Sequence, residues 1–152
     1  MLETVGNTLG RDLKLAVLGQ LSDWPQLVPE LRPHFVLFVA ADVRGVGDGE
    51  LAAFAASALG AGAAYVCAWG PGCDRLTDVV DYVAISRNPA ETEADVVMTT
   101  AHATDTLDEA VRFAVLTAQP AAAYRDTLHS VVTLVVGRAA SVEHVRARLR
   151  ES

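Results

Sequence analysis

Four short apolar runs alternate with four segments of helical periodicity, and this alternation constrains the fold more than any other feature of the chain. The runs are FVLFVAA at 35–41, AAYVCAW at 63–69, DVVMTT at 95–100 and SVVTLVVG at 130–137. Nearly continuous hydrophobicity is typical of parallel strands buried on both faces. We therefore predict an α/β fold, namely a single-domain, three-layer, Rossmann-like arrangement with a mainly parallel sheet of four or five strands.

Helical spacing of apolar residues predicts the segments between and after these strands. The predicted helices span 49–59, 73–83, 107–119 and 142–150. The third has the clearest start, because Thr106 and Glu109 have the spacing of a capping box. Pro120 then ends its apolar pattern, since proline cannot continue a helix.

The first 34 residues are predicted to be an N-terminal extension of an α/β domain that spans 35–152. Within the extension, LKLAVL at 13–18 can form one further strand. The segment WPQLVPELRP at 24–33 contains three prolines, so we expect an extended crossing outside the sheet.

Composition indicates an acidic globular protein. The 152 residues are 51% hydrophobic and 20% charged, which is enough apolar material for a core. Twelve basic residues against 19 acidic ones give a net charge of −7, and such a field opposes nucleic acids and anionic membranes. We therefore expect a basic protein partner or a small cation, no nucleic-acid or membrane partner, and leave a homo-oligomer open.

The chain is expected to be cytoplasmic. Its first ten residues lack the basic segment of a secretory signal, and its two cysteines are too few for a disulfide scaffold. The uncharged stretch 51–69 is long enough to suggest a membrane span. However, its alanine-rich composition and the Gly-Ala-Gly break at 60–62 favour a helix followed by a strand.

Ligands of open parallel sheets bind at the carboxyl ends of the strands, so the residues that follow the predicted strands are the candidate site. On one common edge they are Asp42, Trp69, Gly70, Cys73, Thr99, Thr100, His102 and Arg138.

Cys73 is the most suggestive of these residues, because a helix N-terminus can lower the pKa of a thiol. His102 and Asp105 could serve as its base and orienting group. However, Val79 stands where a Cys-x5-Arg phosphatase loop needs arginine, and Asp74 beside the thiol opposes a thiolate. A structural role at a tight corner is the favoured interpretation, and the catalytic role stays open.

Phosphate and cofactor binding are not predicted. The glycines at 47–49 and 70–72 form neither a dinucleotide-binding nor a Walker pattern, and acidic residues occupy the starts of the following helices. We therefore predict no cofactor and no resident metal. A divalent cation held by the carboxylates of Asp42 and Asp74 is kept as an alternative.

Two stretches, CAWGPGCDRLTDVVD at 67–81 and VVMTTAHATDTLDEAVRF at 96–113, carry a resemblance. They resemble an uncharacterised family of small bacterial α/β proteins with an Ala-Trp-Gly-x-x-Cys corner and a Met-Thr-Thr-x-His strand end. The resemblance covers about 35–148, but Ala101 and Arg112 replace aromatic residues of the family, so it does not extend to an aromatic pocket. It implies site residues Trp69, Gly70, Cys73, Asp78, Asp81, Thr99, Thr100, His102 and Glu109.

Two hypotheses for function follow. The first is a small acidic interaction or regulatory domain that binds a protein partner or a small cationic ligand at the strand carboxyl edge. The alternative is a hydrolase-type enzyme that uses Cys73 with His102, or a divalent metal at Asp42 and Asp74. The first is favoured, because the sequence contains no complete catalytic motif.

Overall fold

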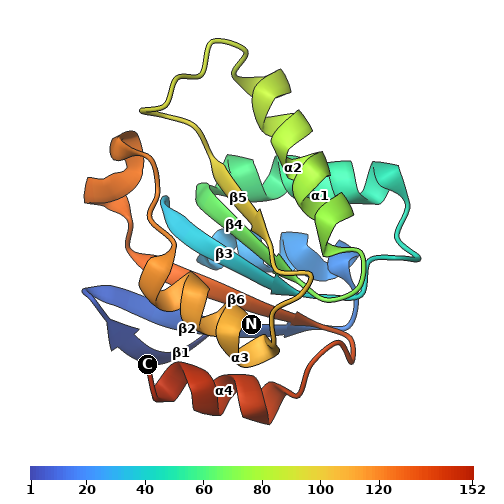
Figure 1. Cartoon of the computed structure of the whole chain (residues 1–152), viewed down its shortest axis with the longest axis vertical. Coiled ribbons are helices and arrows are strands. Elements are labelled where there is room, and N and C mark those ends of the chain that lie inside the picture. The colour runs from blue at the N-terminus through green and yellow to red at the C-terminus, as the bar shows by residue number, and fades with distance from the viewer.

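A six-stranded sheet organises the computed structural model, which describes residues 1–152 (Figure 1). The strand order is β1-β2-β6-β3-β4-β5, and all neighbours are parallel except β1 and β2. The strands are β1 (Glu3–Thr8), β2 (Arg11–Leu18), β3 (Phe35–Ala40), β4 (Ala63–Trp69), β5 (Met98–Ala101) and β6 (Ser130–Val136). The predicted α/β class and mainly parallel sheet are confirmed.

The sheet exceeds the predicted four or five strands because β1 adds an antiparallel edge. The two-residue turn Leu9–Gly10 joins it to β2, and both residues have positive φ, as a tight hairpin requires. The strand sequence ETVGNT is mostly polar and only partly buried. It therefore lacks the apolar run by which the central strands are recognised.

The other elements of residues 1–34 are β2 and the 3₁₀ helix η1 (Leu21–Glu30). The stretch 13–18 lies in β2, and β2 pairs with β6 inside the sheet. The proline-rich crossing lies outside the sheet, as predicted. However, the prediction of an extended conformation is wrong, because the segment forms a 3₁₀ helix. The Asp23 carboxylate accepts the Gln20 N–H at 3.2 Å, and the φ angle fixed by proline suits a 3₁₀ helix.

Helices cover both faces of the sheet (Figure 1). On one face, η1, α1 (Asp48–Ala61) and α2 (Cys73–Arg87) enclose a core with Val39, Val66 and Leu134. On the other face, α3 (Leu107–Arg112), its continuing π-helical turn (Phe113–Thr117) and α4 (Val142–Arg150) enclose a second core with Phe38 and Val135. The short 3₁₀ helix η3 (Ala122–Thr127) precedes β6.

Of the four predicted strands, the one at 95–100 agrees least with the structure. β5 begins only at Met98, because the Asp95 carboxylate accepts the Thr92 N–H at 2.6 Å and the Asn88 side-chain amide at 3.2 Å. These contacts fold the preceding residues into a turn. The strand is also an edge strand with a largely exposed pattern, not one buried on both faces.

No helix in the structure combines the length and the apolar composition that crossing a bilayer requires.

Candidate functional site

Neighbouring loops at the carboxyl edge of the sheet leave toward opposite faces on both sides of β6 and between β4 and β5. After β2, β3 and β4 the chain turns to the face of η1, α1 and α2, whereas after β5 and β6 it turns to the face of α3 and α4. Neighbouring loops therefore diverge on both sides of β6, from those of β2 and of β3, and again between β4 and β5. Such divergence opens a crevice above the strand ends. One crevice spans the ends of β2, β6 and β3, and the other lies between β4 and β5.

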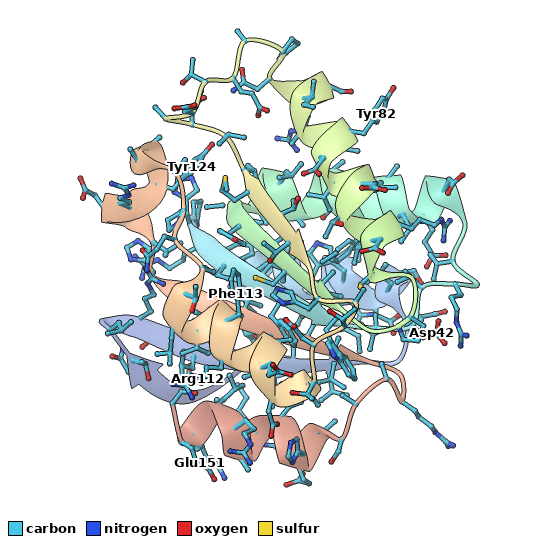
Figure 2. The ribbon with its side chains drawn as sticks, in the orientation of Figure 1. Asp42, Tyr82, Arg112, Phe113, Tyr124 and Glu151 are labelled. Atoms are coloured by element: carbon cyan, nitrogen blue, oxygen red, sulfur yellow. The ribbon has the colours of Figure 1, made fainter.

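The first, here called the Asp42 crevice, has a volume of about 640 Å³. Asp42 and Arg138 both line it, together with Glu50 at the start of α1. Asp42 accepts from Arg44 Nε at 3.0 Å and Nη2 at 2.7 Å, and this pairing lowers the pKa of its carboxyl group. Figure 2 shows Asp42 at the rim of the strand ends, and its carboxylate is committed to its own loop.

The second, here called the Trp69 crevice, has a volume of about 490 Å³ and lies between the ends of β4 and β5. Its lining consists of Trp69, Gly70, Pro71, Gly72, Cys73, Asp74, His102, Ala103 and Asp105. Two carboxylates belong to this lining and no lysine or arginine does. The crevice therefore places two carboxylates beside an aromatic ring.

The corner that forms one wall of this crevice requires glycine. Gly70 has a φ of 112°, and a Cβ atom there would lie 2.2 Å from the Ala41 carbonyl oxygen. Gly72 also has a positive φ, of 82°, directly before α2. These two residues let the chain turn from β4 into α2 while it passes close to the end of β3.

Trp69 links the two walls of the crevice. Its indole Nε1 donates to the Asp105 carbonyl at 3.0 Å, and its half-buried ring packs against the α3 side of the core. The end of β4 is thereby tied to the loop between β5 and α3.

His102 connects a strand residue to a crevice residue. Its Nδ1 lies 2.7 Å from Asp105 Oδ2 and its Nε2 lies 2.8 Å from Thr100 Oγ1. The imidazole is buried, and its ring centre is 4.8 Å from that of Phe113, which lies over the sheet in Figure 2. With its proton on Nδ1, the ring donates to Asp105 and accepts from the Thr100 hydroxyl.

Cys73 is not paired with this histidine. Both imidazole nitrogens are already engaged by Thr100 and Asp105. Burial raises the pKa of the Cys73 thiol, and the neighbouring Asp74 carboxylate raises it further. Hydrogen bonds from nearby backbone amides lower this pKa, but by less than burial and Asp74 raise it. Cys67 on β4 is more deeply buried, which raises its pKa to about 12. Both effects favour the protonated thiol at neutral pH.

The remaining predicted residues lie outside both crevices. Thr99 points to the opposite face of the sheet from Thr100 and donates to Asp81 Oδ1 of α2 at 2.7 Å. Asp78 is exposed on α2. Glu109 completes the predicted capping box, because its side chain accepts the Thr106 N–H at 2.9 Å.

Two further residues shape the Trp69 crevice: Asp105, which the sequence suggested only as an orienting group for His102, and Phe113, which the sequence did not indicate. Asp105 supplies both the acceptor for His102 and the carbonyl for Trp69, and Phe113 covers the imidazole. The three-residue spacing of His102 and Asp105 is compatible with such a pair, but no pattern in the sequence indicates the contact with Phe113. The structure has no group of three or more histidine, cysteine, aspartate or glutamate side chains placed to hold a metal ion.

The hydrogen-bonded chain Thr100–His102–Asp105 gives a testable expectation. Replacing His102 with alanine leaves the Thr100 hydroxyl and Asp105 without this partner and should lower the free energy of unfolding by about 1–3 kcal/mol. Glutamine retains a donor and an acceptor, so His102→Gln should lose less. Urea denaturation of the two variants measures the difference, and equal midpoints for His102→Ala and the wild type would contradict the linking role.

Comparison with known proteins gives one match. The family model described as "Domain of unknown function (DUF7684)" matches residues 13–152, from within β2 to the end of the chain. No curated protein and no solved structure matches the chain. The family match agrees with the resemblance to an uncharacterised family. The chain therefore belongs to the DUF7684 family, whose function is unknown.

Proposed function

We propose that this protein is an interaction domain whose carboxyl edge binds a basic partner, with a lysine or arginine side chain in the Trp69 crevice. The observation that carries the proposal is the lining of that crevice, where Asp74 and Asp105 lie with Trp69 and without any lysine or arginine. A small cationic ligand would make the same contacts with the carboxylates and the indole ring as a lysine or arginine side chain. The test therefore uses a small guanidinium compound.

The lining suits a cation for two physical reasons. Carboxylates attract a positive charge, and the face of an indole ring adds a favourable interaction with an ammonium or guanidinium group. The net charge of −7 also favours encounter with a basic partner over a long range at low salt.

The charge of Asp74 is not neutralised by the nearest arginine in the sequence. Arg75 follows Asp74, but its guanidinium donates to Asp48 Oδ1 at 2.7 Å and to the Val43 carbonyl at 2.9 Å. It is thus directed toward the loop before α1. Asp74 makes no ion pair and is exposed.

The crevice is also held in place before any partner arrives. His102 orients the Asp105 carboxylate, Trp69 is fixed by the Asp105 carbonyl, and Gly70 fixes the corner. Ordering these groups on binding costs little, since they are already ordered.

We further propose that the chain is one domain with a Rossmann-like three-layer arrangement, in which residues 1–34 extend the domain 35–152, and that the protein is cytoplasmic. Two unpaired cysteines, Cys67 and Cys73, favour such a reducing environment.

The test is an NMR titration with N-acetyl-arginine amide, compared with its neutral isostere N-acetyl-citrulline amide. We expect a saturable shift of the Trp69 indole resonance with the arginine compound only, weakening as salt is added. Asp74→Asn should weaken binding about fivefold, the effect of one exposed charge pair. Asp126→Asn is the matched control, because Asp126 is exposed on η3 at a distance from the crevice lining. An equal response to citrulline, or shifts that avoid the crevice, would overturn the proposal.

A further inference from the structure

The outer edge of β5 is open. β5 is the last strand of the sheet and pairs only with β4. The His102 N–H donates to the Ala68 carbonyl of β4 at 2.8 Å. Because successive residues of a strand direct their peptide groups to opposite sides, those of Thr99 and Ala101 point away from β4.

This edge has little protection against pairing. Sheet edges are commonly blocked by charged residues or proline, but the β5 sequence MTTA contains neither. Met98 is 41% exposed, and Ala101 is also exposed. No charged residue or proline of β5 itself therefore blocks an extended segment from the free peptide groups.

Helix α2 runs beside this edge (Figure 1). Asp74, Asp78 and Asp81 of α2 are here called the acidic ridge. The bond between Thr99 Oγ1 and Asp81 Oδ1 fixes which side of α2 faces β5. At 3.6 residues per turn, Asp74, Asp78 and Ile85 lie within about 60° of Asp81 around the helix. Tyr82 lies farther round, on the outer side of α2 in Figure 2.

We infer that an extended basic segment of the partner adds to the outer edge of β5 as a further strand of the sheet. Main-chain hydrogen bonds to Thr99 and Ala101 hold the segment, as in other cases of strand addition. Side chains of a strand alternate, so every second one faces α2 and the others face the side of Met98. The matching segment alternates basic residues, toward Asp78 and Asp81, with apolar residues toward Met98.

Charge selects this occupant over a second copy of the chain. Two copies joined through β5 would bring two acidic ridges together, and each molecule carries a net charge of −7. A basic segment neutralises the same ridge. This inference rests on the proposed function, because the carboxyl end of β5 leads directly to His102 in the lining of the Trp69 crevice.

The probe is an acetylated and amidated hexapeptide of alternating lysine and valine, and its control replaces lysine with glutamate. We expect the lysine peptide to slow amide hydrogen exchange at Thr99 and Ala101, and the glutamate peptide to have no effect. Ala101→Pro removes the outward N–H at an edge position where proline is tolerated. It should weaken binding about fivefold, the effect of one hydrogen bond.

A second variant keeps the inference testable if proline disturbs the strand. Asp78→Lys reverses a charge on the ridge and should also weaken binding of the lysine peptide, whereas the matched exposed change Asp126→Lys should not. Circular dichroism and thermal midpoints establish that each variant is folded.

The outcomes separate this inference from the proposed function. Shifts at Trp69 without protection of Thr99 and Ala101 would overturn the strand addition and leave the crevice proposal standing. If β5 is protected but the arginine compound fails to shift the Trp69 resonance, the result would support strand addition at β5 and overturn cation binding in the Trp69 crevice. Protection that grows with protein concentration in the absence of peptide would identify a second copy as the occupant and overturn the inference. Absence of both effects would overturn both proposals.

Discussion

Replacing Trp24 with alanine is expected to lower the free energy of unfolding by about 3–5 kcal/mol, the usual cost of removing a fully buried large aromatic side chain. The indole ring meets Phe54 edge to face at a centroid distance of 5.3 Å. Its Nε1 donates to Ser57 Oγ at 3.0 Å, so the alanine variant also loses a hydrogen bond. Both partners belong to α1, and the variant therefore weakens the packing of η1 on the rest of the core.

Urea denaturation followed by circular dichroism measures this change. Tyr82→Ala is the matched control, because the Tyr82 ring is 73% exposed and its removal should change stability by less than about 0.5 kcal/mol. An unchanged midpoint for Trp24→Ala would mean that η1 contributes little to the cooperative core.

Replacing Gly70 with alanine is the second change with a large expected effect. A methyl group there would lie 2.2 Å from the Ala41 carbonyl oxygen, and the φ of 112° is itself unfavourable for alanine. Since the obstacle is backbone, relief requires movement of the β3 or β4 end, and we expect a loss of about 3 kcal/mol or more.

Gly45→Ala is the control for this substitution. A Cβ atom at Gly45 meets nothing within 4 Å, and the backbone there lacks the positive φ. Its effect should stay within about 1 kcal/mol. The thermal midpoints of both variants decide the comparison, and similar midpoints would show that the corner relaxes easily. A shifted Trp69 indole resonance in Gly70→Ala would report the displacement of the crevice wall.

The central strands could be predicted from the sequence because burial on both faces leaves a continuous apolar run. The predicted segments 35–41, 63–69 and 130–137 correspond closely to β3, β4 and β6. Edge elements bury less surface and leave a weaker pattern, so β1 was missed and the start of β5 was placed too early. The 3₁₀ form of η1 depends on a local contact of Asp23, which apolar periodicity does not reveal.

Parallel topology made the common edge of the candidate site predictable, since all carboxyl strand ends meet there. The division of this edge into two crevices could not be predicted, because the division depends on the face of the sheet to which each loop turns. The sequence also suggested Asp42 as a free metal ligand and the His102 imidazole as a base for Cys73. In the structure Arg44 holds Asp42. Asp105 contacts His102 as expected of an orienting group, but Thr100 holds the other imidazole nitrogen, so neither nitrogen is left for the thiol.

The position of β6 between β2 and β3 has a consequence for biosynthesis. β6 is the last strand to be translated, yet Leu13 and Val36 both pair with the same residue of it, Val131. While the ribosome is still making residues 130–136, β2 and β3 have no common neighbour and their facing edges are unpaired. Nascent chains that stop before β6 should therefore be recognised by chaperones or aggregate, because such edges pair readily with other chains. Completion of the sheet must wait until the final strand has left the ribosome.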